Sequence, residues 1–401
     1  MNILVLTRYF PCSEREKKSN NTKVVSAFVK KWTGFGHRVL VIVNSSVFPR
    51  AYYPVAGIFR NRVFKHYDIT RFPELFWNKD FSYTEDGASV YNLPMIKYYP
   101  SSPYTNAKYR KQLCRILSVL EKNCFIPDII TGHWVNPQLK LISMLKPYFP
   151  KAKTALVFHS DYTQDKIKKY KVEQYLEDID HVGFRSFPAA LEAKKYLNLK
   201  DRSFVCLSGI PDEYIEESYN CEKNFEGKFR IVFAGRLLKL KNIDKTILAA
   251  IESFGYDFDM TIAGEGPYSQ DLLDLIKAYN AQDRVNLIGK VSREMVQDIM
   301  KKSHIFALIS KETFGLVYLE AMLQGCIVIA SKNCGVDGII KNGYNGFLCE
   351  QGDKEELEKI FREIKNLPKD DLRRISCSAV ETARNLSESS AARNYLLEIQ
   401  V

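Results

Sequence analysis

Twelve apolar runs of strand length alternate with helical patterns along this chain, and that alternation constrains the fold more than any other feature. Parallel strands joined by helices are buried on both faces of their sheet, so they read as near-continuous apolar segments. Six runs lie in each half of the chain. The pattern therefore predicts an α/β protein with two doubly wound parallel sheets.

The expected elements follow directly from this pattern. Strands are expected at 2–7, 38–43, 128–132, 154–159, 181–185, 204–207, 230–234, 260–263, 285–288, 305–309, 327–330 and 346–349. Helices are expected at 22–34, 107–122, 186–197, 243–254, 268–279, 293–301, 315–324, 354–365 and within 370–401, with Ser292 as the N-cap of the sixth.

A chain of 401 residues is longer than one hydrophobic core usually serves, so two domains are expected. The stretch 208–228 is polar, acidic and rich in turn residues, as a linker would be. We therefore expect one domain over 1–207 and a second over 208–385. The final helix, 386–401, is a candidate to pack back on the first domain.

Composition excludes several classes of protein. Apolar residues make up 46% and charged residues 26%, as in globular proteins, and no window holds 18 uninterrupted apolar residues. The N-terminus lacks a basic region and reads as a first strand, not as a signal peptide. Nine scattered cysteines without a C-x-x-C pair favour a reducing compartment and argue against zinc or structural disulfides.

Charge and aromatic residues are unevenly distributed. Residues 1–210 hold 33 Lys and Arg against 17 Asp and Glu, a net +16, whereas the remainder is −5. This is either drift in surface composition or a face for a polyanion, namely an anionic membrane, a phosphorylated acceptor or nucleic acid. Residues 45–110 hold 16 aromatic and nine basic residues. They suit irregular structure with short strands over the core, or alternatively a lid or membrane-facing surface.

A pair of acidic residues brackets a helix start in the second half. Glu312 follows the strand 305–309, and the amides of Phe314, Gly315 and Leu316 would lie at the N-terminus of the next helix, which favours a phosphate. Glu320 would lie at most about 12 Å from Glu312. That distance is about the separation of the sugar ring and the ribose in one nucleotide sugar. Alternatively, this spacing of two Glu residues on an amphipathic helix arises by chance.

The sequence around these residues resembles the retaining glycosyltransferases of GT-B fold, family 4. Glu312 to Glu320 forms an E-x7-E motif that runs into Ala321-Met322-Leu323-Gln324-Gly325. Four other segments resemble family motifs in the same order: Phe233-Ala234-Gly235-Arg236-Leu237 with Lys241-Asn242, Ile262-Ala263-Gly264-Glu265-Gly266-Pro267, Arg284-Val285-Asn286-Leu287-Ile288-Gly289-Lys290-Val291, and Asn342-Gly343-Tyr344-Asn345-Gly346-Phe347.

The first half resembles the family more loosely. Similar segments are Tyr9-Phe10-Pro11-Cys12-Ser13-Glu14, Gly36-His37-Arg38-Val39, Gly132-His133-Trp134 with Pro137, Phe158-His159-Ser160-Asp161, and Ser208-Gly209-Ile210-Pro211. Where many relatives have a Gly-Gly pair, this chain reads Lys18-Ser19-Asn20-Asn21-Thr22. The resemblance implies two Rossmann-like domains that face a cleft, with the acceptor on the first and the nucleotide sugar on the second.

The resemblance also implies roles for individual residues. Arg236 and Lys241 would bind the donor diphosphate, Glu312 the sugar and Glu320 the ribose. The backbone of Val291 would contact the base, and His159 would bind the donor sugar and support the transition state. His133 would either contact the acceptor or support a neighbouring site residue, and Asn21 would contact the acceptor. Two fixed cations can neutralise the leaving group, so no metal or cofactor is expected.

The activity implied is retaining transfer of a sugar from a UDP- or GDP-linked donor to a glycan or lipid-linked acceptor of cell-surface polysaccharide or glycolipid. The enzyme is expected in the cytoplasm, where it would bind peripherally to the inner face of the cytoplasmic membrane. It is not expected to bind nucleic acid. A GT-B protein that binds sugar nucleotides without transfer and a GT-B epimerase are the alternatives. A dehydrogenase would need a G-x-G-x-x-G loop after a strand, which is missing here.

Overall fold

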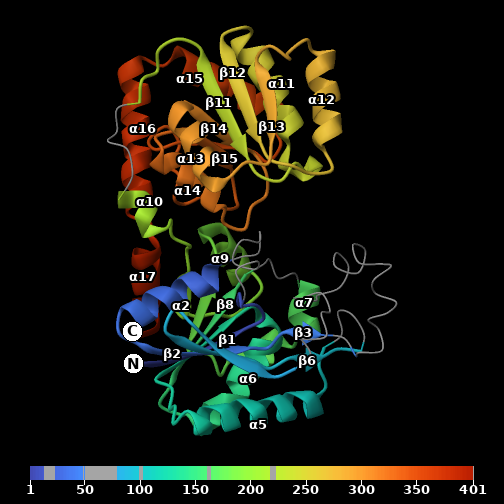
Figure 1. Ribbon diagram of the computed structural model, residues 1–401, viewed down its shortest axis with the longest axis vertical. Coiled ribbons are helices and arrows are strands. Elements are labelled where there is room, and N and C mark those ends of the chain that lie inside the picture. The colour runs from blue at the N-terminus through green and yellow to red at the C-terminus, as the bar shows by residue number, and fades with distance from the viewer. Residues whose placement is uncertain are drawn as a thin grey trace. The chain divides into compact units, whose positions relative to one another are not determined.

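The computed structural model describes residues 1–12, 23–47, 49, 79–98, 103–159, 164–216 and 223–400 (Figure 1). Contacts divide the chain into two compact units. Unit 1 comprises Met1–Arg185, Ala190–Cys206 and Ala391–Val401, and unit 2 comprises Ser186–Ala189 and Leu207–Ser390.

Unit 1 is built on an eight-stranded sheet of order β10-β9-β8-β7-β1-β2-β5-β4. All neighbours are parallel except the hairpin of β4 and β5. A separate parallel pair is formed by β3 and β6. The strands are β1 Asn2–Thr7, β2 Arg38–Val43, β3 Ser46–Val47, β4 Phe81–Glu85, β5 Ala88–Asn92, β6 Met95–Ile96, β7 Ile129–His133, β8 Lys153–Phe158, β9 His181–Phe184 and β10 Ser203–Val205.

Helices cover both faces of this sheet, as doubly wound folds require. In Figure 1, α2 and α17 lie on one face, and α5 and α6 lie on the other. The elements are α2 Val24–Gly34, α5 Asn106–Lys122, α6 Val135–Leu145, the 3-10 turn η3 Lys146–Tyr148, α7 Gln164–Lys169, α8 Val172–Leu176, α9 Phe187–Lys194 and α17 Glu388–Gln400.

The last helix is fastened to the unit 1 sheet by polar and aromatic contacts. The hydroxyls of Tyr395 and Thr131 share a hydrogen bond of 2.5 Å, and the indole of Trp32 donates to the carbonyl of Ala392 at 3.0 Å. The Tyr395 ring also packs on Phe28 and Trp32, with ring centroids 5.2 and 5.3 Å away. Residues 391–400 therefore complete the core of unit 1.

Unit 2 is built on a six-stranded, all-parallel sheet of order β13-β12-β11-β14-β15-β16. Its strands are β11 Phe229–Ala234, β12 Phe258–Ala263, β13 Val285–Gly289, β14 Ile305–Leu308, β15 Ile327–Ser331 and β16 Phe347–Cys349. Its other elements are α10 Asp212–Glu216, the 3-10 turn η4 Lys239–Lys241, α11 Ile243–Phe254, α12 Ser269–Ala278, α13 Arg293–Lys302, α14 Leu316–Leu323, α15 Lys354–Asn366 and α16 Lys369–Arg384.

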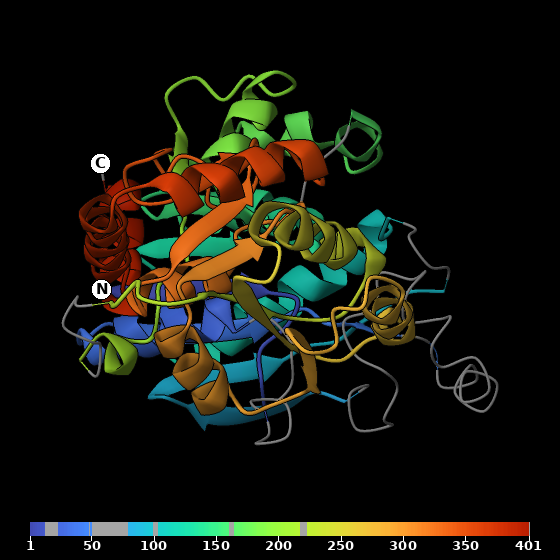
Figure 2. The same cartoon turned by 90° about the horizontal axis from the view of Figure 1, so that it is seen from above.

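Helix packing and capping in unit 2 follow the sequence closely. Helix α11 packs against α12 and α15, and α14 packs against α13 and α16. Figure 2 shows red helices beside the orange strands of this unit. The hydroxyl of Ser292 accepts the amide of Met295 at 3.2 Å, so the expected N-cap is confirmed. The carboxylate of Asp353 caps α15 in the same way, on the amide of Glu356.

The predicted doubly wound sheets are confirmed, and the main addition is the β4–β5 hairpin. Its two-residue turn, Asp86-Gly87, has positive φ at both positions (48° and 80°), as a type I′ turn requires. The hairpin lies within the aromatic stretch 45–110, of which 48, 50–78 and 99–102 fall outside the described residues. Helix α10 lies within the stretch expected to be a linker.

One expectation about cysteine is wrong: Cys377 is disulfide-bonded. A disulfide depends on the distance between two cysteines in the fold, which spacing along the chain does not reveal. Seven other described cysteines are free thiols.

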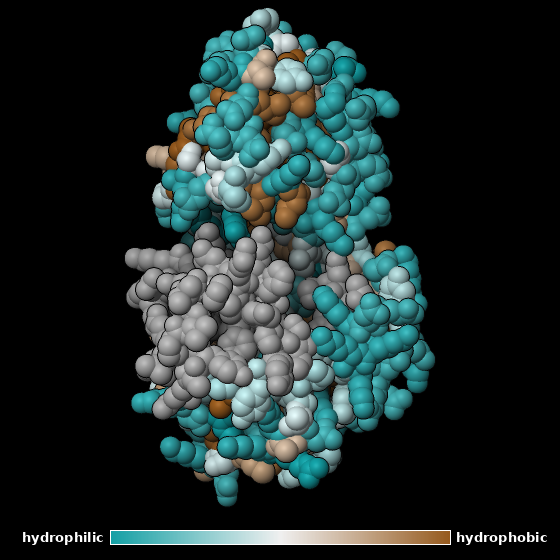
Figure 3. Space-filling view, turned by 90° about the vertical axis from the view of Figure 1, so that its right-hand side faces the viewer, coloured by the Kyte–Doolittle hydropathy of each residue, from teal (hydrophilic) through white to brown (hydrophobic). Residues whose placement is uncertain are grey.

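Most of the surface of the described residues turned to the viewer in Figure 3 is hydrophilic, with small apolar groups between. Among the described helices, none has both the length and the apolar character that a membrane crossing needs.

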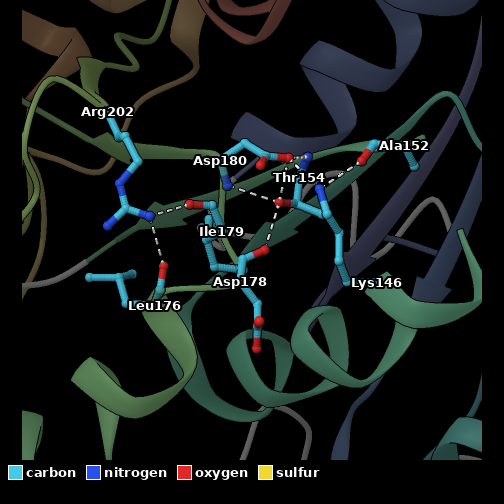
Figure 4. A network of polar contacts seen from close by, with 8 residues as sticks. All are labelled: Lys146, Ala152, Thr154, Leu176, Asp178, Ile179, Asp180 and Arg202. Carbon is cyan, nitrogen blue, oxygen red and sulfur yellow. Dashed lines mark hydrogen bonds and ion pairs between the residues drawn. The ribbon is translucent and has the colours of Figure 1, made fainter. Parts of the chain in front are cut away.

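A polar network joins the amino ends of β8 and β9 (Figure 4). The carboxylate of Asp180 accepts from the Lys146 ammonium at 2.6 Å, and from the amide and hydroxyl of Thr154 at 2.8 and 2.9 Å. Arg202 donates to the carbonyls of Leu176 and Ile179. Ligands of such sheets bind at the carboxyl ends of the strands, so this network is structural.

Asp180→Asn should lower the free energy of unfolding by about 1 kcal/mol at pH 7, since the carboxylate is about a third exposed. Burial alone would raise the pKa of Asp180, but the hydrogen bonds from Lys146 and Thr154 outweigh it, so the pKa is lowered. A carboxyl group whose pKa is lower in the folded state stabilises the fold at any pH above its pKa in the unfolded state. This stabilisation is lost as the pH falls through the pKa of the folded state.

Urea unfolding at pH 7, 4.5 and 3 checks this prediction. The difference in the free energy of unfolding between wild type and Asp180→Asn should persist at pH 4.5. It should become smaller below pH 3.8, the ordinary pKa of Asp. Asp201→Asn, at an exposed position of the same unit, is the matched control and should change nothing. A difference that widens at pH 3 would contradict the assignment.

Candidate functional site

Three loops meet at the carboxyl edge of the unit 2 sheet, where β11, β12 and β13 end. Backbone hydrogen bonds hold the loops together. A Cβ at Gly264 would lie 1.8 Å from the carbonyl oxygen of Gly235, so only glycine allows this approach. In each bond a backbone amide donates to a backbone carbonyl. The pairs, with the donor first, are Gly235 and Ala263 (3.0 Å), Leu237 and Glu265 (3.0 Å), Tyr268 and Leu237 (3.2 Å), and Gly264 and Gly289 (2.8 Å).

Arg236 is displayed by the first of these loops. Its side chain is exposed, and its guanidinium forms no hydrogen bond or ion pair with the residues that the structure describes. The backbone of Val291, just after β13, likewise has no hydrogen-bond partner in the described part of the chain. Both groups are therefore available to a ligand at this edge.

Lys241 and Glu312, which are 71 residues apart in sequence, form an ion pair through the Lys241 Nζ and the Glu312 Oε1. The hydroxyl of Ser310 donates to the same oxygen at 2.7 Å. Lys241 ends η4, and Asn242 after it is left-handed (φ 53°) and donates to the carbonyl of Ile309 at 2.8 Å. The two side chains are about one-fifth exposed, so the pair is partly shielded from water but reachable.

Helix α14 begins beside Glu312. Gly315 is its N-cap, with φ 84°, and a Cβ there would lie 2.5 Å from the Tyr318 ring. The Tyr318 hydroxyl donates to the carbonyl of Leu308 at 2.8 Å, which fixes the ring beneath the turn. Phe314 is buried, whereas Gly315 and Leu316 are partly exposed. The helix thus starts in a fixed position with its N-terminal amides beside the Lys241–Glu312 pair.

Glu320 is almost fully buried and pairs with Arg293, the first residue of α13. The Arg293 guanidinium lies over the ring of Tyr214 in α10, 5.1 Å from its centroid. Sequence reasoning missed Arg293 and Tyr214, because no motif spacing links α10, α13 and α14. Arg293 therefore occupies one of the two carboxylate oxygens of Glu320.

In unit 1, His133 and His159 lie at the carboxyl ends of the neighbouring strands β7 and β8. The His133 Nδ1 and the His159 Nε2 are 2.9 Å apart. The Trp134 ring stacks on His159 with centroids 4.1 Å apart. Asn21, the other acceptor candidate, lies outside the described residues, as do Ser160 and Asp161.

Both histidines are held neutral. Burial, with a smaller effect of the Arg185 charge, lowers the pKa of His133 to about 3. Burial, and then His133 and Arg185, lowers the pKa of His159 well below its ordinary value. Neither ring is a cation at neutral pH, so each can offer one N–H and one lone pair.

Two units that each carry a doubly wound, mainly parallel sheet define the class of this protein, which is the GT-B fold. The apo form of the lipopolysaccharide outer core galactosyltransferase WaaB is similar over 100% of this chain and 99% of that chain, with a TM-score of 0.70 and 14% identity. Anabaena Alr3699/HepE in complex with UDP is similar over 100% of both chains, with a TM-score of 0.66 and 15% identity.

The family model described as glycosyl transferases group 1 matches residues 215–380. The matched stretch carries Arg236, Lys241, Glu312 and Glu320. The resemblance read from the sequence motifs is confirmed at this level.

Two relatives illustrate the sequence similarity. The N-acetyl-alpha-D-glucosaminyl L-malate synthase of Bacillus anthracis is 38% identical over 98 residues, which are 24% of this chain and 25% of the relative. The uncharacterized glycosyltransferase MJ1069 of Methanocaldococcus jannaschii is 26% identical over 82% of this chain and 90% of the relative. The chain thus aligns with a quarter of the first relative and with most of the second.

Proposed function

We propose that this chain is a retaining glycosyltransferase of family 4 that moves a sugar from a nucleotide-sugar donor to a glycan or lipid-linked acceptor. The observation that carries the proposal is the edge of the unit 2 sheet. There Arg236, which has no partner among the described residues, the Lys241–Glu312 pair and the start of α14 offer two cations, a carboxylate and backbone amides. These groups match a diphosphate joined to a sugar.

Further support comes from related proteins. HepE of similar fold was solved with UDP, WaaB is named as a lipopolysaccharide outer core galactosyltransferase, and the Bacillus relative is named as an N-acetyl-alpha-D-glucosaminyl L-malate synthase. These names support a donor linked to UDP and a role in cell-surface polysaccharide or glycolipid synthesis, and a GDP-linked donor stays the alternative.

The proposed reaction breaks the bond between sugar C1 and the leaving phosphate oxygen and forms a bond from C1 to the acceptor oxygen. The acceptor proton passes to a leaving phosphate oxygen on the same face of the sugar, so the configuration at C1 is retained. Arg236 and Lys241 neutralise the charge that develops on the diphosphate. Glu312 accepts from sugar hydroxyls, Glu320 from ribose hydroxyls through its second oxygen, and the Val291 backbone contacts the base.

The residues fit a reaction in which the protein's own cations supply this charge neutralisation, and we propose that no metal is required. In the described ranges, no group of three or more His, Cys, Asp or Glu side chains is placed to hold a metal ion. Transfer activity in the presence of excess EDTA tests this part of the proposal.

A panel of UDP-, GDP- and ADP-sugars tests the proposed function. One donor should raise the thermal unfolding temperature of the wild-type protein, because a ligand that binds only the folded state stabilises it. Incubation of that donor with acceptor should then release the nucleoside diphosphate. Stabilisation without turnover would indicate a binding protein, and an altered sugar without acceptor would indicate an epimerase.

We further propose that the protein works in the cytoplasm, on the inner face of the cytoplasmic membrane. Free thiols at seven described cysteines favour a reducing compartment, despite the disulfide at Cys377. Unit 1 also exposes basic side chains on two helices, namely Arg110 and Lys111 on α5 and Lys166, Lys168 and Lys169 on α7.

Sedimentation with liposomes tests the membrane proposal. At low salt the protein should sediment with vesicles that contain phosphatidylserine and not with pure phosphatidylcholine, and 0.5 M NaCl should release it. Replacing the three α7 lysines by glutamine should weaken binding, because each basic residue near such a surface contributes about 1 kcal/mol. Equal recovery with both kinds of vesicle, or with neither, would contradict the proposal.

A further inference from the structure

We propose that His133 is a positioning residue that donates its Nδ1–H to the Nε2 of His159 and thereby fixes the proton of His159 on Nδ1. This inference rests on the proposed function for the role of His159, which the family resemblance assigns to the donor sugar. The position of the proton is tested separately. Of the two roles expected for His133, contact with the acceptor and support of a neighbouring residue, we propose the second.

The first step of the argument is the burial of His133. Its side chain is fully buried, between the rings of Phe28 and Tyr395, whose centroids lie 6.1 and 5.8 Å from its own. Its Nδ1 faces the His159 Nε2 at 2.9 Å, and its Nε2 has no hydrogen-bond partner among the described residues. A ring without an exposed atom does not reach an acceptor sugar.

The second step is where the shared proton lies. If His159 donated from Nε2, neutral His133 would carry its own proton on Nε2, where a buried N–H would lack an acceptor. If His133 donates from Nδ1, only an unprotonated Nε2 remains unpaired. Orphaned buried N–H groups are rarer in proteins than unsatisfied acceptors, so the second arrangement is favoured.

The third step is what this does to His159. A neutral His159 that accepts at Nε2 must carry its proton on Nδ1. That nitrogen has no hydrogen-bond partner in the described part of the chain, and the residue is only partly buried. Stacking on Trp134 fixes the plane of the ring. The Nδ1–H of His159 is therefore a hydrogen-bond donor before any ligand binds. It can donate to the oxygen of a sugar hydroxyl, but it cannot accept a proton from a phosphate.

The burial that lowers the pKa of both histidines agrees with this arrangement, because a protonated ring would supply two donors to one acceptor. The charge of Arg185, which is buried after β9, opposes protonation of either histidine. Orienting partners of this kind typically change activity by about 10–100-fold when removed.

The first experiment reads the proton directly. The wild-type protein is labelled with ¹⁵N-histidine, and the six histidines are resolved in a long-range ¹H–¹⁵N spectrum, with His159→Gln used to assign one signal. His159 should show a protonated Nδ1 and an unprotonated Nε2. A His159 signal with the proton on Nε2 would overturn the inference, whether or not the protein transfers sugar.

The second experiment compares two isosteric variants. The amide nitrogen of an asparagine lies near the position of a histidine Nδ1, so His133→Asn keeps a donor to His159, whereas His133→Leu removes it. With a donor that the wild type uses, His133→Leu should lower kcat/KM by about 10–100-fold, and His133→Asn should recover most of that loss. The two variants should unfold at similar temperatures.

The pattern of outcomes separates the two proposals. Equal loss in both variants together with lowered unfolding temperatures would indicate a structural role for His133 and overturn the inference. An unchanged His159 signal in His133→Leu would do the same. If the wild type uses no sugar nucleotide, the proposed function fails, while the spectrum of His159 still decides where its proton lies.

Discussion

Arg236→Ala is expected to lower the rate of sugar transfer by at least about 100-fold, mainly in kcat. The Arg236 guanidinium is exposed at the carboxyl end of β11 and has no partner among the described residues. The charge on a leaving diphosphate grows as its bond to the sugar breaks, so a fixed cation stabilises the transition state more than the ground state. Initial rates of nucleoside diphosphate release, measured over a range of donor concentrations, give kcat and KM separately.

Two further variants make this prediction specific. Arg236→Lys keeps the charge but loses the planar fork, so it should recover only part of the rate. Lys239→Ala removes an exposed cation from η4, three residues away, and should leave transfer within about twofold, as a surface substitution does. Near-normal transfer in Arg236→Ala would exclude the role assigned to this side chain.

Gly264→Ala should have the second large effect, because it separates the loops that form the site. Its Cβ would lie 1.8 Å from the Gly235 carbonyl oxygen, which belongs to the backbone and cannot rotate away. We expect a loss of about 3 kcal/mol in the free energy of unfolding, at the upper end of overpacking costs. A shift of about 1 Å at Arg236 could lower transfer by about 100-fold.

Thermal unfolding and the transfer assay together check this prediction. Gly343→Ala is the matched control, because Gly343 has a positive φ (73°) but open space around its Cα. It should lose only the cost of a left-handed alanine, roughly 1 kcal/mol. If Gly264→Ala unfolded at the same temperature as Gly343→Ala and kept full transfer, the close contact between the loops would be unimportant.

Much of the fold could be predicted because the buried strands carry a strong signal. Strand β15, for example, is buried at every position and is apolar up to its last residue, Ser331. The β4–β5 hairpin was missed because β4 alternates half-buried and exposed residues at the edge of its sheet and has no such run. The Asp86-Gly87 turn between the two strands was the signal that could have revealed it.

The candidate site could be predicted as a set of residues but not as a set of contacts. Glu312, Lys241 and Arg236 follow strands of one sheet, so their placement at one edge follows from topology. The pairings depend on the tertiary structure: Lys241 with Glu312, Arg293 with Glu320, and His133 with His159 are separated by 71, 27 and 26 residues. No spacing rule brings together groups on different elements.

The central claim is that the edge of the unit 2 sheet grips a nucleoside diphosphate. A crystal structure with the nucleoside diphosphate of the stabilising sugar donor tests it most directly. The account predicts phosphate oxygens within hydrogen-bond distance of Arg236 and Lys241, the ribose at Glu320 and the base at the Val291 backbone. A nucleotide bound to the folded protein elsewhere, with these four positions empty, would contradict it.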